Sequence, residues 1–140
     1  MNYTNTVESL NKSAKGTLME ALQIRFIDFV NERLTAEMPV SKSTIQPYGF
    51  LHGGATMALA ESVGGALSIL SLDDKSLIAV GIEINANHLL PVMDGKVKAT
   101  ASFLRKGNSI HVLDIRVTDN SDRLISVCRL TNKILKKEEL

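Results

Sequence analysis

Hydrophobic and polar residues alternate in four stretches of the second half of the chain. These stretches cover residues 78–90, 96–105, 109–118 and 123–135. In the first of them, Ile82 and Ile84 fall on one face, and Gly81 and Glu83 fall on the other. A period of two is typical of strands with one buried face, and Gly95 and other turn residues separate the stretches. The pattern predicts four consecutive antiparallel strands with one covered face.

The first half of the chain shows helical periods and one further alternating segment. Apolar residues at helical spacing predict an amphipathic helix over residues 6–18. Alternation over residues 24–40 predicts a strand with a turn or bulge near Asn31. From Gly53 to about Leu70 the apolar residues lie all around a helical wheel, which is typical of a buried helix.

The order of these elements favours one architecture. A strand, one long apolar helix and four antiparallel strands pack economically as a curved sheet wrapped around the helix. We therefore predict a single α+β domain over residues 1–140 with the hot-dog arrangement. Such a sheet leaves edge strands open, and pairing with a second copy covers one of them. We expect at least a dimer.

Composition excludes several classes of partner. The 140 residues carry a net charge of +1 and no tryptophan, so neither a charged nucleic-acid or membrane surface nor a base-stacking platform is expected. The single cysteine, Cys128, cannot form an internal disulfide and lies in a predicted strand, as a small core residue would. The three histidines lack metal-ligand spacing, so no metal or cofactor is expected.

The chain shows no convincing membrane or export signal. The segment 53–72 is long enough to span a membrane, but its glycines, serines and glutamate oppose that reading. The first residues lack the basic start and apolar run of a signal peptide. We predict a cytoplasmic protein.

The apolar helix contains candidate catalytic groups. Glu61 is the only charged residue between Gly53 and Leu72. A carboxylate in a buried helix is desolvated, which raises its pKa unless hydrogen bonds stabilise the anion, and such a group suits a nucleophile or general base. Gly53 and Gly54 open the helix, where free N–H groups and the helix dipole favour an oxyanion or a polarised carbonyl.

The segments "QPYGFLHGGATMALAES" and "GIEINANHL" resemble the hot-dog-fold acyl-CoA thioesterases of the phenylacetate-degradation type. The resemblance covers residues 38–134 and is strongest to the branch of 1,4-dihydroxy-2-naphthoyl-CoA and enterobactin-associated thioesterases. It implies that Gln46, His52 and His88 line the thioester pocket. It also implies that the turn "RKGNS" contacts CoA through Arg105, Lys106, Gly107, Asn108 and Ser109. Pockets in this family are shared between subunits, and many members are homotetramers.

Helix geometry independently predicts a shared site. Glu61 lies eight residues beyond Gly53, which is about 12 Å along a helix at roughly 1.5 Å per residue. One carbonyl carbon cannot contact both residues of a single helix. Two antiparallel helices across a two-fold axis bring Gly53 of one chain near Glu61 of the other, and this predicts two sites per dimer.

One position departs from the family pattern. Related enzymes often carry Ser or Thr four residues after the glutamate, where this chain has Gly65. Ser62 faces elsewhere, whereas Ser68 lies on the same face two turns on. Gly65 leaves the positioning of water open, or provides room for a bulkier acyl group.

The resemblance favours hydrolysis of an aromatic acyl-CoA, such as a benzoyl-type thioester or the 1,4-dihydroxy-2-naphthoyl-CoA of menaquinone synthesis. Medium-chain acyl groups remain open, because hydrophobic pockets discriminate poorly. A hot-dog hydroxyacyl-thioester dehydratase and a non-catalytic acyl-CoA-binding oligomer are the alternatives. The sequence leaves open whether Glu61 attacks the carbonyl or activates water, and whether the protein is a dimer or a tetramer.

Overall fold

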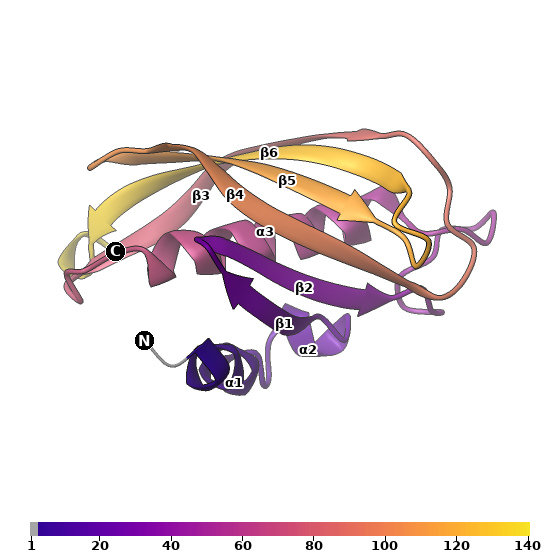
Figure 1. The fold of residues 1–140 in the computed structure, drawn as a ribbon, viewed down its shortest axis with the longest axis horizontal. Helices are drawn as coiled ribbons and strands as arrows, with labels where there is room; N and C mark the ends of the chain where they lie inside the picture. The colour runs from indigo at the N-terminus through magenta and orange to yellow at the C-terminus, as the bar shows by residue number, and fades with distance from the viewer. Residues whose placement is uncertain (1–2) are drawn as a thin grey trace.

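Six antiparallel strands form one curved sheet in the computed structural model, which describes residues 3–140 (Figure 1). Residues 1 and 2, which belong to the predicted domain, lie outside this range. The strand order is β1-β2-β4-β5-β6-β3, so β1 and β3 are the edges. The strands are β1 (Arg25–Val30), β2 (Arg33–Pro39), β3 (Leu77–His88), β4 (Lys96–Lys106), β5 (Ile110–Thr118) and β6 (Leu124–Lys136). The predicted α+β hot-dog architecture is confirmed.

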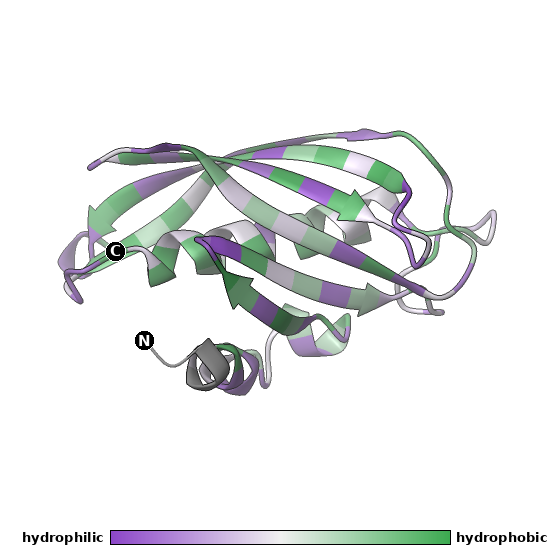
Figure 2. Ribbon diagram, viewed as in Figure 1, coloured by the Kyte–Doolittle hydropathy of each residue, from purple (hydrophilic) through white to green (hydrophobic). Residues whose placement is uncertain are grey.

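The long helix α3 (Gly53–Leu70) runs along one face of this sheet and contacts β2 to β6 (Figure 1). Figure 2 shows the alternating hydropathy of the strands that supplies the apolar face. Leu59 and Val63 of α3 pack in one core with strand residues such as Leu113 and Leu130. Gly64 allows this close approach, because a Cβ there would lie 2.6 Å from Leu130 Cδ2. Burying these side chains contributes roughly 1.5–3 kcal/mol each.

Two predicted elements are interrupted in the structure. The predicted strand over residues 24–40 is a hairpin of β1 and β2, because Asn31 and Glu32 adopt positive φ angles of 50° and 54° and reverse the chain. The predicted helix over residues 6–18 is α1 (Tyr3–Ser13) followed by a short α2 (Leu18–Ala21). Gly16 at φ 71° separates them, and the Thr17 side chain caps α2 by accepting from Met19 N–H. A short 3₁₀ helix, η1 (Lys137–Glu139), ends the chain.

The prediction that α3 is buried on all sides is wrong for the single chain. A one-layer sheet covers only one face of a helix, and Glu61 and Ile69 lie exposed on the other face. By length and composition alone α3 is apolar enough to cross a membrane. Its contacts with five strands account for that composition, because it is the helix around which the core forms.

The predicted alternation of β3 also fails at one position. Ile82 was expected on the same face as Ile84, but its side chain is 57% exposed. The pairing of β3 with β6 shifts register between Gly81 and Glu83, so Ile82 is the extra residue of a bulge. The bulge changes which residues of β3 face α3, and it does so directly beside Gly81.

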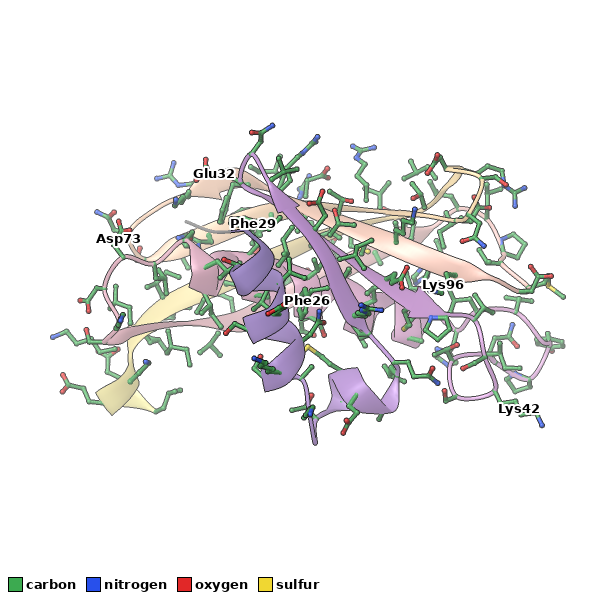
Figure 3. The ribbon with its side chains drawn as sticks, turned by 60° about the horizontal axis from the view of Figure 1, so that its bottom comes forward. Phe26, Phe29, Glu32, Lys42, Asp73 and Lys96 are labelled. Atoms are coloured by element: carbon green, nitrogen blue, oxygen red, sulfur yellow. The ribbon has the colours of Figure 1, made fainter. Side chains whose placement is uncertain are left out.

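A side chain from α1 covers part of the open edge of β1. The Asn11 amide Nδ2 donates to Phe26 O at 2.9 Å, and Asn11 Oδ1 accepts from Phe26 N–H at 2.9 Å. The two bonds imitate the pairing that a neighbouring strand would make. Figure 3 shows α1 beside Phe26 in the view from this side. The β1 edge is therefore partly satisfied within the chain.

Candidate active site

Four of the predicted site residues line one cavity at the start of α3. Gln46, His52, Gly53 and His88 surround a volume of about 560 Å³. The loop before α3 supplies the first two, and His88 ends β3. The remaining lining is mainly apolar and comprises Phe50, Leu51, Thr56, Leu89, Leu90, Pro91, Met93 and Ile125. The cavity thus combines polar groups on one side with apolar walls, as pockets for small molecules do.

His52 is the N-cap of α3. Its Nδ1 accepts a hydrogen bond from Gly54 N–H at 2.8 Å, and its own backbone is extended at φ −72° and ψ 132°. Since Nδ1 is an acceptor, the neutral ring carries its proton on Nε2. The expectation that both glycine N–H groups are free is therefore wrong for Gly54. Gly53 N–H makes no hydrogen bond with any of residues 3–140, and it remains the available donor at the positive end of the helix.

Gln46 is fixed by a tight turn. Its backbone N–H donates to Phe50 O at 2.9 Å, and its carbonyl accepts from Gly49 N–H at 2.9 Å. Gly49 has a φ of 88°, which a side chain would disfavour. The side-chain Oε1 of Gln46 accepts from Tyr48 N–H. Because its oxygen is engaged, the side chain presents its NH₂ group as a donor.

His88 lies against the first residue of α3, and a buried serine holds it there. A Cβ on Gly53 would lie 2.6 Å from His88 Nε2. Ser126 Oγ lies 3.1 Å from His88 Nδ1 and donates to Asn87 O at 3.1 Å. Because the hydroxyl has one proton, His88 Nδ1 is the donor in their bond, which in the neutral ring leaves Nε2 as an acceptor.

Sequence reasoning missed Ser126. Its signal was a polar residue among the inward positions of β6, where Cys128 and Leu130 also lie. Cys128 is buried as predicted, and burial raises the pKa of its thiol, which makes it a poor nucleophile.

Glu61 lies in a different cavity of the same chain. This second cavity, of about 410 Å³, is lined from α3 by Glu61, Ser62, Gly65, Ala66 and Ile69. Its opposite wall comes from α1, α2, the loop between them and Phe26. The Glu61 carboxylate makes no hydrogen bond or ion pair with any described residue. A single chain therefore does not bring Glu61 together with Gly53.

Gly65 widens this second cavity, whereas Ser68 does not reach it. A Cβ built at Gly65 would meet no atom within 4 Å. Ser68 is 0% exposed, and its hydroxyl accepts from Asn132 Nδ2 at 2.7 Å. Ser68 lines neither cavity, because its face of the helix packs against β6.

The turn predicted to contact CoA joins β4 and β5 and is largely exposed. Its backbone is tied down, since Gly107 N–H donates to Ile110 O at 3.0 Å and Ser109 O accepts from Ile134 N–H at 2.9 Å. Lys106 pairs with Glu32 at 3.1 Å across an exposed surface. Figure 1 shows the β4–β5 turn at the left end of the molecule and the loop before α3 at the right end. Within one chain, this turn therefore lies far from the cavity lined by Gln46, His52, Gly53 and His88, which we call the donor cavity.

The residues described contain no group of three or more His, Cys, Asp or Glu side chains arranged to hold a metal ion. The two cavities present N–H donors, imidazole rings and one carboxylate. That set can polarise a carbonyl and deliver a nucleophile or a base.

Comparison with known proteins identifies the family. The model of the thioesterase superfamily matches residues 48–126. A 1,4-dihydroxy-2-naphthoyl-CoA hydrolase from Escherichia coli is 39% identical over 130 residues, which cover 93% of this chain and 95% of that enzyme.

Solved structures give the same picture. A Pseudomonas aeruginosa thioesterase, crystallised with a glutamine-to-alanine substitution, is 42% identical to this chain and superposes with a TM-score of 0.91. The match covers 93% of this chain and 94% of the Pseudomonas chain. A Staphylococcus aureus thioesterase with a glutamine-to-alanine substitution is 36% identical with a TM-score of 0.80, covering 84% of this chain and 97% of its own. A second structure of that protein carries a glutamate-to-alanine substitution. The chain therefore belongs to the thioesterase superfamily.

Proposed function

We propose that this thioester hydrolase cleaves an acyl-CoA at two sites shared across a dimer. Glu61 comes from one chain, and Gly53, His52 and Gln46 come from the other. The observation that carries the proposal is the separation of these groups into two cavities of one chain. The single helix α3 carries both Gly53 and Glu61 and keeps them about 12 Å apart, so only a second copy supplies both to one carbonyl.

The donor cavity suits the thioester carbonyl. Gly53 has an unpaired N–H, His52 presents Nε2–H, and Gln46 presents its NH₂ group. All three residues line the same cavity. Donors aimed at a developing oxyanion stabilise the transition state more than the ground state. His88 Nε2 lies beside these donors, against Gly53. As an acceptor it does not bind an oxyanion, so we assign His88 a structural role in the wall of the pocket.

Glu61 supplies the second half of the reaction. Its carboxylate has no partner within the described chain, so both oxygens are available. As a general base it takes a proton from water, the water oxygen bonds to the carbonyl carbon, and the C–S bond breaks to release CoA thiolate. As a nucleophile it forms a mixed anhydride that water then hydrolyses. Single-turnover hydrolysis in ¹⁸O-water identifies the anhydride route when water attacks the Glu61 carboxyl carbon, because the first product then carries ¹⁶O from Glu61 and the enzyme retains ¹⁸O.

The cavity beside Glu61 suits an aromatic acyl group. Its walls are mainly apolar, with Leu10, Leu18, Met19 and Phe26 facing α3, and Gly65 leaves open space where a side chain would project. The 39% identical relative acts on 1,4-dihydroxy-2-naphthoyl-CoA. We therefore propose aromatic acyl-CoA thioesters, of the benzoyl or dihydroxynaphthoyl kind, as the substrate class.

The antiparallel arrangement also accounts for the predicted CoA contacts. The turn between β4 and β5, which spans Arg105 to Ser109, lies at the opposite end of the molecule from the start of α3 and the donor cavity (Figure 1). In a dimer with antiparallel helices, that turn of one chain lies at the same end as Gly53 of the other. Arg105 and Lys106 then meet the nucleotide phosphates outside the acyl pocket.

The variants chosen in relatives support two of the assigned residues. In the Staphylococcus aureus thioesterase, the substituted glutamine and glutamate are separated by the same number of residues as Gln46 and Glu61 here. The Pseudomonas aeruginosa thioesterase carries a glutamine substitution as well. Those studies targeted a pair with the spacing that this site requires.

Thiol release measured with DTNB tests the proposal. Wild type, Glu61→Ala and Glu61→Gln are assayed with benzoyl-CoA, 1,4-dihydroxy-2-naphthoyl-CoA and decanoyl-CoA. We expect aromatic substrates to give the highest kcat/KM, and both variants to lose about a hundredfold or more in kcat. Full activity in either variant would contradict the role of Glu61. Decanoyl-CoA as the best substrate would contradict the aromatic class but leave the mechanism standing.

A further inference from the structure

Gly81 on β3 lies directly against the Glu61 carboxylate. A Cβ built at Gly81 would lie 2.7 Å from Glu61 Oε1 and 3.8 Å from the carboxyl carbon. Side chains at this position of the ladder point toward α3, as the paired residue Asn132 shows by bonding to Ser68. The missing side chain therefore creates a recess in the sheet, and the end of Glu61 occupies it.

The backbone does not require glycine at this position. Gly16, Gly49 and Gly95 have positive φ angles of 71°, 88° and 78°, whereas Gly81 is not among the positive-φ residues. Glycine inside a strand weakens it, and it often marks a place where another group approaches closely. The group that approaches here is the Glu61 carboxylate.

We propose that Gly81 is a positioning residue, whose lack of a side chain forms the recess that sets the place of the Glu61 carboxylate. This inference rests on the proposed catalytic role of Glu61. No hydrogen bond or ion pair from a described residue orients the carboxylate, so its contact with β3 determines where it lies. The recess is closed at its far side by Asn132 Oδ1, 3.6 Å from the same Cβ position. That oxygen is a buried acceptor without a partner among the described residues, so it repels a carboxylate oxygen.

An alanine at position 81 therefore moves Glu61 outward. The oxygen must retreat by about 0.7 Å to reach an ordinary contact of 3.4 Å, and Asn132 Oδ1 blocks a deeper position. The atom that moves is the free end of a flexible side chain, so the fold changes little. A shift of about 1 Å in a reacting group can cost about a hundredfold in rate.

The experiment is a cycle of wild type, Gly81→Ala, Glu61→Asp and the double variant. We expect Gly81→Ala to lower kcat about 10- to 100-fold, with KM within about threefold and the molar mass of the assembly unchanged. Asp is shorter by one methylene and no longer reaches the recess. In the Glu61→Asp background, Gly81→Ala should therefore cost less than about threefold. A merely structural role for Gly81 would give the same loss in both backgrounds.

Glu83→Ala is the matched control. Glu83 lies two residues further along β3, its side chain is exposed, and it is bonded to Asn85 rather than to Glu61. We expect its kcat to equal that of wild type. This control separates a general disturbance of the strand from the contact with Glu61.

The outcomes distinguish this inference from the function on which it rests. Unchanged activity in Glu61→Ala contradicts the proposed function itself. An inactive Glu61→Ala beside a fully active Gly81→Ala overturns the role of Gly81 alone. A Gly81→Ala protein that fails to fold also overturns it, and so does an equal drop in Tm whether Glu61 is intact or replaced by alanine. In both cases the new side chain would disturb the strand itself rather than the Glu61 carboxylate.

Discussion

A site shared between two chains makes a quantitative prediction for mixed dimers. Glu61→Gln removes the carboxylate, and Gly53→Pro removes the N–H donor at the start of α3. Proline is tolerated at the first position of a helix, and His52 already has the extended backbone that a following proline requires. Each homodimer then lacks one half of both of its sites, and each should lose about a hundredfold or more in kcat.

The mixed dimer has one intact site. Gly53 and Glu61 lie about 12 Å apart on one helix, so a site combines Gly53 of one chain with Glu61 of the other. In a dimer of Glu61→Gln with Gly53→Pro, one site carries both lesions and the other carries neither. A purified mixed dimer should therefore have about half the activity of wild type, and an unselected equal mixture about one quarter.

Two differently tagged chains, co-expressed and purified on both tags, provide the mixed dimer for the DTNB assay. The control pairs wild type with a chain that carries both substitutions. Under a shared site, this control has one lesion in each site and should be nearly inactive. Sites within single chains predict the reverse for both pairs: an inactive first dimer and a half-active control. That reversed result would refute the shared site.

Three further predictions concern single positions. Gly53→Pro and Gly53→Ala both place a carbon against His88, but only proline also removes the backbone N–H. The proline variant should therefore lose about 10²- to 10³-fold more in kcat than the alanine variant. Equal losses in the two variants would contradict the donor role of Gly53. Gly64→Ala should lower the free energy of unfolding by about 1–3 kcal/mol in urea denaturation, since its Cβ would lie 2.6 Å from Leu130 Cδ2; an unchanged midpoint contradicts that packing. Burial, aided by the charge of Lys106, lowers the pKa of His111 below 6.5. His111 therefore binds a proton at a higher pH in the unfolded chain than in the folded chain. Its contribution to the free energy of unfolding is complete above pH 6.5 and is lost as the pH falls through the pKa of the folded state. Thermal unfolding should show this decline, and His111→Gln should flatten it.

The sequence predicts the scaffold well because its signals are local. The bounds of α3, from Gly53 to Leu70, follow from its apolar run, and the last four strands follow from their period of two. The turn or bulge predicted near Asn31 is the turn of the β1–β2 hairpin. The full reversal of the chain was not predicted, because Glu32, a residue that seldom adopts positive φ, completes the turn after Asn31.

The details of the site depend on contacts between distant segments. Ile82 was expected to continue the alternation, but a period cannot reveal the extra residue of a bulge. The exposure of Glu61 was missed because composition indicates how apolar a helix is, not how many layers cover it. The contact of Gly81 with Glu61 joins positions 20 residues apart across the fold, and no local pattern encodes it.

Asn11 has a consequence for how copies of this chain associate. With the Asn11 amide paired to Phe26, the β1 edge has fewer backbone groups to offer another sheet, whereas β3 forms the opposite edge. If two copies pair through β3, only their β1 edges face outward. Further addition of sheets then gains little, so growth ends at a closed pair rather than an endless ribbon. Asn11 thus disfavours edge-to-edge polymerisation at β1, while the β3 edge remains available for pairing.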